Sequence, residues 1–98
     1  MEMPFLVSSV YLNNIQYING KAFLTISLNG VNNVFIAYPE DGEISVMRSS
    51  DELSKLLMHL SQLLMHLSQY ESSIYKKIFT LVWDYVKGKD VILPAKLL

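Results

Sequence analysis

Cysteine is absent from this 98-residue chain, which excludes disulfide bonds and thiolate metal sites. Charged residues make up only 17% of the chain and the formal net charge is −1, so the electrostatic attraction of a typical nucleic-acid binder is missing. No apolar run approaches the ~20 residues that a membrane-spanning helix needs, and the first residues lack the basic start of a secretory signal. We therefore expect a cytoplasmic protein without a membrane contact or a nucleic-acid partner.

Apolar side chains, in contrast, are abundant. They make up 51% of the residues, in a length that suits one domain spanning residues 1–98 with one small core. Such a core cannot enclose all of them, so the remainder must be exposed or buried against another chain. This surplus predicts an interaction surface.

Short apolar segments with turn residues between them fill the first half of the chain. Residues 5–12 and 15–18 are typical of strands, separated by a pair of asparagines that favours a turn. Asn19 and Gly20 then indicate a type I′ hairpin turn. Residues 21–28 alternate, which is typical of a strand with one buried side. The predicted inward residues are Ala22, Leu24, Ile26 and Leu28, and the outward ones are Phe23, Thr25 and Ser27.

Two further strands are predicted before the second half. A turn at residues 29–33 precedes a strand at 34–38, which Pro39 ends. Another turn at 40–42 precedes a strand at 43–48. Because these turns are short, neighbouring strands must be antiparallel. In the last strand the predicted inward residues are Ile44 and Val46, and the outward ones are Glu43, Ser45 and Met47.

The heptapeptide LLMHLSQ occurs twice in succession over residues 56–69. Seven residues make nearly two helical turns, so a copy extends an α-helix and returns each side chain to almost the same face. Ser49, with Glu52 three residues later, predicts a capping box where the helix begins. An apolar stripe for packing follows at helical spacing. Its members are Leu53, Leu56, Leu57, Leu60, Leu63, Leu64 and Leu67.

The sequence permits either one long helix or two shorter ones. Residues 68–73 are polar and favour a break, so we prefer two helices. The second, residues 74–87, has an apolar arc wider than half its circumference, which predicts contacts on two sides. Gly88 is suited to end it. Residues 90–98 are apolar again and favour an edge strand or a docked arm.

These patterns together predict an α+β fold. An antiparallel meander of four to five strands is followed by one long or two shorter C-terminal helices, which pack on one face of the sheet.

Our leading functional hypothesis is a non-enzymatic protein-interaction module that forms a homodimer through its C-terminal helices. Met58 and Met65 point away from the leucine stripe, and flexible thioethers suit an adaptable contact surface. Tyr75, Phe79 and Trp83 recur every four residues along the second helix. A symmetric dimer is the commonest way to bury such surfaces.

The alternative hypothesis is a small-molecule or nucleotide binder, or a weak hydrolase, with His59, His66 and Tyr70 in a cleft. Seven residues along a helix separate the two histidines by ~10 Å, too far to share one zinc ion. We therefore expect no cofactor. The serines and glycines form no nucleophile elbow and no phosphate-binding loop, which argues against an enzyme.

Nothing in the sequence names a partner. Its content of Asn, Ile, Tyr and Lys and the perfect tandem copy are typical of small viral or plasmid genes from AT-rich genomes. In that setting, the natural version of an interaction module is an accessory protein that binds a host protein.

Overall fold

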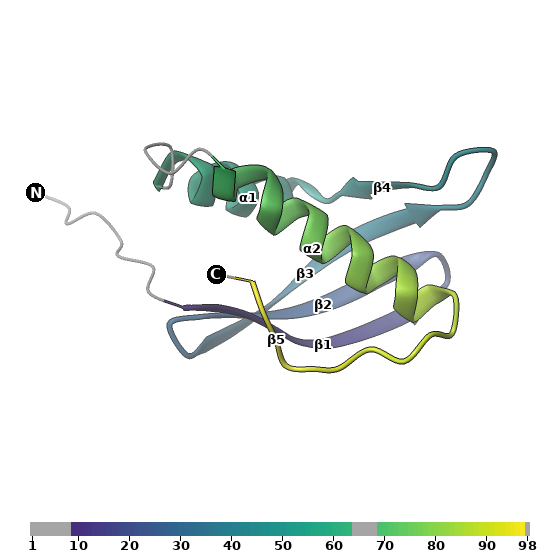
Figure 1. The fold of residues 1–98 in the computed structure, drawn as a ribbon, viewed down its shortest axis with the longest axis horizontal. Coiled ribbons are helices and arrows are strands. Elements are labelled where there is room, and N and C mark those ends of the chain that lie inside the picture. The colour runs from purple at the N-terminus through teal and green to yellow at the C-terminus, as the bar shows by residue number, and fades with distance from the viewer. Residues whose placement is uncertain (1–8, 64–68, 98) are drawn as a thin grey trace, which may run out of the picture.

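The computed structural model describes the backbone of residues 9–63 and 69–97, and the side chains of residues 9–60 and 74–97. It confirms the predicted α+β fold. A five-stranded antiparallel sheet in the order β4-β3-β2-β1-β5 carries both helices on one face (Figure 1). The strands are β1 (Val10–Ile18), β2 (Lys21–Leu28), β3 (Val31–Glu40), β4 (Val46–Ser49) and β5 (Ala95–Lys96), and the helices are α1 (Asp51–Leu63) and α2 (Gln69–Val86).

The β1–β2 hairpin confirms the predicted turn. Asn19 and Gly20 have φ angles of 51° and 78°, which a type I′ turn requires at both central positions. The predicted break at Asn13 and Asn14 is wrong, because β1 continues past them through a bulge between Leu12 and Asn14. A bulge accommodates one extra residue without ending the strand. The start of the predicted strand, residues 5–8, lies outside the described residues.

The second hairpin is tighter than predicted. Asn29 and Gly30 close it alone, with φ angles of 51° and 87°, and β3 begins at Val31. Asn32 and Asn33, predicted as turn residues, pair with β2. The reason is geometric, since two residues with positive φ already reverse the chain and cross-strand pairing resumes at once.

Pro39 does not end β3, which continues to Glu40. The backbone N–H of Ser50 donates to the carbonyl of Ile36 at 2.9 Å, so alternate residues of β3 direct their backbone groups to β4. Pro39 therefore directs its nitrogen towards β2, whose pairing with β3 ends at Ala22 and Ala37. The missing N–H of Pro39 thus removes no bond from the sheet.

The predicted orientation of β4 is also wrong. Its register pairs Met47 with Pro39 and puts Met47 on the core side, whereas Ile44 and Val46 are exposed. The strand starts only at Val46, after a loop without regular structure. The side-chain pattern admitted both orientations, and pairing with β3 decided between them.

Helix α1 is capped one residue later than predicted. The backbone N–H of Leu53 donates to the hydroxyl of Ser50 at 3.2 Å, so Ser50 is the N-cap and Ser49 belongs to β4. Asp51 and Glu52 then lie in the first turn, where the helix dipole favours acidic side chains.

The chain forms two helices, as preferred from the sequence, but α2 begins at Gln69, within the run that was predicted to break the helix. Only the first heptapeptide copy lies within α1. The second copy starts at Leu63, the last residue of α1, and ends at Gln69, the first residue of α2. Its middle, residues 64–68, lies outside the described residues.

The end of α2 and the C-terminal segment confirm their predictions. Gly88 has a φ of 80° and donates its N–H to Tyr85, while Lys89 donates to Asp84, which is a Schellman ending. The chain then returns along the sheet, and β5 pairs with the start of β1 as an edge strand (Figure 1).

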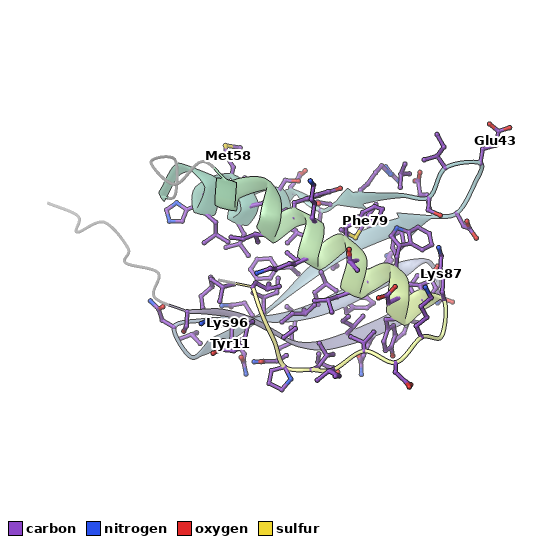
Figure 2. All side chains as sticks on the ribbon, in the orientation of Figure 1. Tyr11, Glu43, Met58, Phe79, Lys87 and Lys96 are labelled. Carbon is purple, nitrogen blue, oxygen red and sulfur yellow. The ribbon has the colours of Figure 1, made fainter. Side chains whose placement is uncertain are left out.

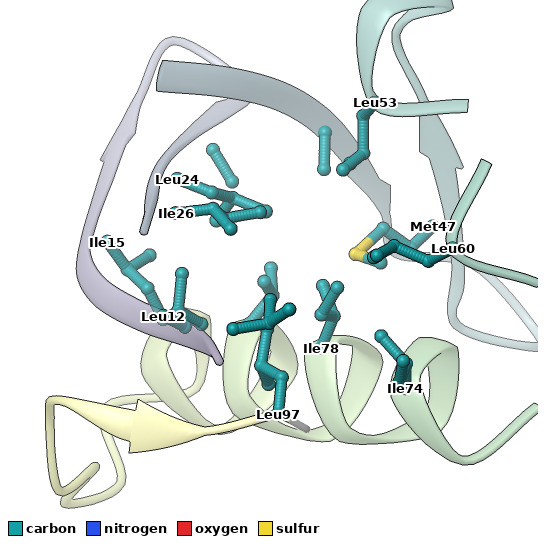
Figure 3. Packing of buried hydrophobic residues seen from close by; sticks show 14 residues of the cluster. Leu12, Ile15, Leu24, Ile26, Met47, Leu53, Leu60, Ile74, Ile78 and Leu97 are labelled. Atoms are coloured by element: carbon teal, nitrogen blue, oxygen red, sulfur yellow. The ribbon is translucent and has the colours of Figure 1, made fainter. Parts of the chain in front are cut away.

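The core lies between the inner face of the sheet and the two helices (Figure 3). Helix α2 contributes Ile74, Ile78 and Val82, which recur every four residues on one face. Leu53 and Leu60 are buried, as the leucine stripe predicted. Each such side chain contributes about 1.5–3 kcal/mol when fully buried. The sheet contributes Val10, Leu12, Ile15, Ala22, Leu24, Ile26, Ala37 and Met47, and Leu97 closes the core from the C-terminal segment.

Candidate functional site

One face of the sheet has no helix over it in the described part of the chain (Figure 1). Successive side chains of a strand point to opposite faces, so the neighbours of each core residue lie on this outer face. The cross-strand pairs Phe23–Ile36 and Thr25–Val34 place these side chains there. The sheet and the helices thus form two layers, and no described helix covers the outer face of the sheet.

An apolar patch occupies the middle of this outer face. Phe23 on β2 is paired with Ile36 on β3, and Val34 and Tyr38 flank Ile36 at two-residue spacing. Side chains directly opposite in such a pair have Cβ atoms about 5 Å apart, so the patch is continuous. Val34 is 60% exposed, and the other three are partly exposed. These four residues are called the β2–β3 patch below.

Charged side chains lie at the border of the β2–β3 patch, not inside it. The Nε atom of Arg48 is 2.7 Å from Oε1 of Glu40, and its guanidinium lies 5.7 Å from the ring centre of Tyr38. Because both charged side chains are largely exposed, this ion pair contributes little stability. It orients Arg48 over one edge of the patch and leaves the centre uncharged.

At the opposite end the outer face becomes polar. The side-chain amide of Asn13, the bulged residue of β1, donates to Oδ1 of Asn32 on β3 at 2.9 Å. Ser27 on β2, which is paired with Tyr11 and Asn32, is buried. Tyr11 is paired in turn with Lys96 of β5, and Figure 2 shows the two side by side. These groups bound the β2–β3 patch on the side of the β2–β3 turn.

The aromatic residues predicted on the interaction surface pack mainly within the protomer. Phe79 is only partly exposed and lies between Tyr75 and Trp83, with ring centres 6.3 Å and 6.4 Å away. Trp83 is 5% exposed, and Nζ of Lys87 lies 5.5 Å from its ring centre. Trp83 therefore offers almost no area to a partner. Tyr75 donates its hydroxyl to the carbonyl of Met47 at 3.0 Å.

The two methionines have different outcomes. Met58 is 57% exposed on α1, as expected from its place opposite the leucine stripe (Figure 2). Met65 lies outside the described residues. The helical interaction surface therefore stays a prediction, with Met58 and part of Tyr75 as its accessible apolar groups.

The predicted ligand site is not assembled by the described residues. His59 is exposed on α1, whereas His66 and the side chain of Tyr70 lie outside them. Within the described residues no three His, Cys, Asp or Glu side chains form a group that could hold a metal ion. The His-containing cleft stays a prediction.

No family model matches the chain, and the comparison with curated proteins gives no match either. Among the described residues, no helix is both long and apolar enough to cross a membrane.

Sequence reasoning missed the β2–β3 patch as a surface. A signal was present, because alternation had already placed Phe23 on the outward side of its strand. The contributions of Val34, Ile36 and Tyr38 depend on the register between β2 and β3, which no single segment determines.

Proposed function

We propose that this chain is a non-enzymatic protein-interaction module that forms a homodimer, with the β2–β3 patch of one copy packed against the same patch of the other. The observation that carries the proposal is the outer face of the sheet, which no described helix covers and which has Phe23, Val34, Ile36 and Tyr38 in its middle. The proposal keeps the dimer expected from the sequence but moves its interface from the helices to the sheet.

The charge distribution favours a second copy as the occupant. In a symmetric dimer each patch meets itself, so a charge near the centre faces its own copy and repels it. The centre of the outer face holds Thr25 and Gln16 beside the apolar patch, with no charged residue among them. Arg48 and Glu40 are paired at the border, where solvent screens them.

The size of the face is also sufficient. Strands β1 to β4, spaced about 4.8 Å apart and averaging about eight residues in length, give a flat footprint of roughly 500 Å². Two such faces together bury roughly 1,000 Å², which is the lower limit for a specific interface. Two such faces, stacked at about 10 Å, form a sandwich with a second apolar layer.

Light scattering coupled to size exclusion tests the proposal. At micromolar concentration we expect the wild-type chain at twice its 11.2 kDa mass, and Val34→Lys at the monomer mass. The lysine places two like charges in the centre of the interface and removes apolar contact.

Val31→Lys is the matched control. Val31 lies on the same strand, is 63% exposed, and belongs by its pairing with Leu28 to the other face. This variant should remain dimeric. A monomeric wild-type protein, or equal effects of the two lysines, would contradict the proposed interface.

A further inference from the structure

Strand β4 forms one edge of the sheet, and β3 is its only neighbour among the described strands. An edge strand directs backbone N–H and C=O groups outward, where another strand can pair with them. Beside this edge the exposed apolar residues Ile44 and Val46 extend the available surface. The edge is therefore a second place where a strand of another chain can pair with the sheet.

The backbone groups that point outward can be identified from one hydrogen bond. The N–H of Ser50 donates to the carbonyl of Ile36, so Ser50 directs its groups towards β3. In an antiparallel ladder this direction alternates from residue to residue. Arg48 therefore also faces β3, and Met47 and Ser49 direct their N–H and C=O groups away from it.

The outward carbonyl of Met47 already accepts one hydrogen bond. Tyr75 reaches it from α2 and donates its hydroxyl to this oxygen at 3.0 Å. An added strand would need the same oxygen as an acceptor. With the Tyr75 hydroxyl in place, this oxygen would have to accept two hydrogen bonds at once, so the hydroxyl weakens strand addition. Tyr75 itself is exposed and is not a member of the buried core.

We propose that β4 pairs with β4 of a second copy, and that the hydrogen bond from the Tyr75 hydroxyl to the Met47 carbonyl opposes this pairing. An antiparallel pair centred on Met47 exchanges two bonds, each from one Met47 N–H to the Met47 carbonyl of the other copy. In this register Val46 lies opposite Arg48, so no like charges meet. The contact uses the edge of the sheet and is independent of the β2–β3 patch on its face.

The experiment compares two tyrosine variants in a Val34→Lys background, which removes the contact proposed for the outer face. Tyr75→Phe deletes only the competing hydroxyl, and sedimentation should show dimers with a Kd at least tenfold lower than in the parent. Tyr85→Phe is the control, because Tyr85 is equally exposed but lies about 15 Å further along α2. It should leave the sedimentation unchanged.

Adding Val46→Lys to Tyr75→Phe tests the register. The lysine would lie opposite Arg48 of the other copy at two places, whereas in its own protomer it is paired with Glu40 and is tolerated. The gained association should disappear. The proposal is overturned if this triple variant still associates, or if Tyr85→Phe associates equally.

It is also overturned if Tyr75→Phe keeps the native circular dichroism spectrum and the mass of its parent. Tyr75→Leu removes the same donor with a different side chain, so it supplies the test if the phenylalanine variant loses its fold. If the wild-type chain is itself monomeric, the outer-face proposal fails. The comparison of Tyr75→Phe with Tyr85→Phe in the wild-type background then still tests the pairing of β4.

Discussion

Glycine has different roles at different turns of this chain. Gly20 adopts a φ of 78°, in the left-handed region where a Cβ atom is strained, although nothing lies within 4 Å of the position it would take. Gly42 has equally open space but no positive φ. Backbone conformation, and not crowding, therefore distinguishes the two sites.

Gly20→Ala should accordingly lower the free energy of unfolding by about 1–2 kcal/mol, the typical cost of left-handed backbone for a residue with a Cβ. Gly42→Ala should leave it unchanged or raise it by a few tenths of a kcal/mol, since alanine restricts the unfolded chain. Urea denaturation of both variants measures the difference. Equal losses would show that the β1–β2 turn does not require its observed φ.

Trp83 is buried in the protomer, although its four-residue spacing from Phe79 and Tyr75 placed it on the predicted interaction surface. Its ring is buried, and its Nε1 has no hydrogen-bond partner among the described residues. A buried N–H without a partner costs about 1–3 kcal/mol, which the burial of a large aromatic ring offsets. Trp83 therefore contributes to the packing of α2 within the protomer.

At the scale of elements, the start of α1 depends on one hydroxyl. Ser50→Ala should destabilise the protein by about 1 kcal/mol, because it leaves the N–H of Leu53 without its cap. Ser49→Ala is the control, since Ser49 ends β4 and caps nothing. Thermal denaturation followed at 222 nm compares them. A larger loss from the Ser49 variant would restore the cap position predicted from the sequence.

The C-terminal segment is held to the sheet by β5 and by one buried side chain. Leu97 is 2% exposed, and its N–H donates to the carbonyl of Val10 at 2.8 Å. Leu97→Ala should therefore cost about 2–5 kcal/mol, the usual range for truncating a buried leucine.

Ile92→Ala is the matched control in the same segment, because Ile92 is 86% exposed. It should change the stability by less than about 0.5 kcal/mol. If the two variants prove equally stable in urea, the segment does not dock through Leu97.

For the whole molecule, the distribution of apolar side chains over two layers decides where a partner can bind. One set of apolar residues is buried between the helices and the inner face of the sheet, and the β2–β3 patch lies on the outer face. A dimer that forms through this patch should have a melting temperature that rises with protein concentration, because association stabilises only the folded chain.

The only tryptophan reports on the location of the interface. Dissociation by Val34→Lys should leave the fluorescence maximum of Trp83 unchanged, since Trp83 lies on the helical layer and is buried within its protomer. A red shift on dissociation would indicate that the dimer forms through the helices instead. Val31→Lys, on the same strand, provides the reference spectrum.

Features with local causes were predictable from the sequence. Asn19 and Gly20 tolerate positive φ, the alternation of β2 gives the strand one apolar side that is buried, and Gly88 ends a helix, each because of the geometry of a few adjacent residues. The two-layer α+β fold followed from these segments, since short turns require antiparallel neighbours and an apolar stripe requires a surface to pack on.

Features with distant causes depend on how the strands pair and how the helices pack. Met47 and not Val46 enters the core, Pro39 remains within β3, and Trp83 is buried, because strand pairing and helix packing fix which side of each element meets the interior. Composition alone predicts more apolar side chains than one small core can enclose. The fold left the β2–β3 patch on the outer face of the sheet, because both helices pack against the other face, and it left Met58, Tyr75 and Ile92 exposed elsewhere.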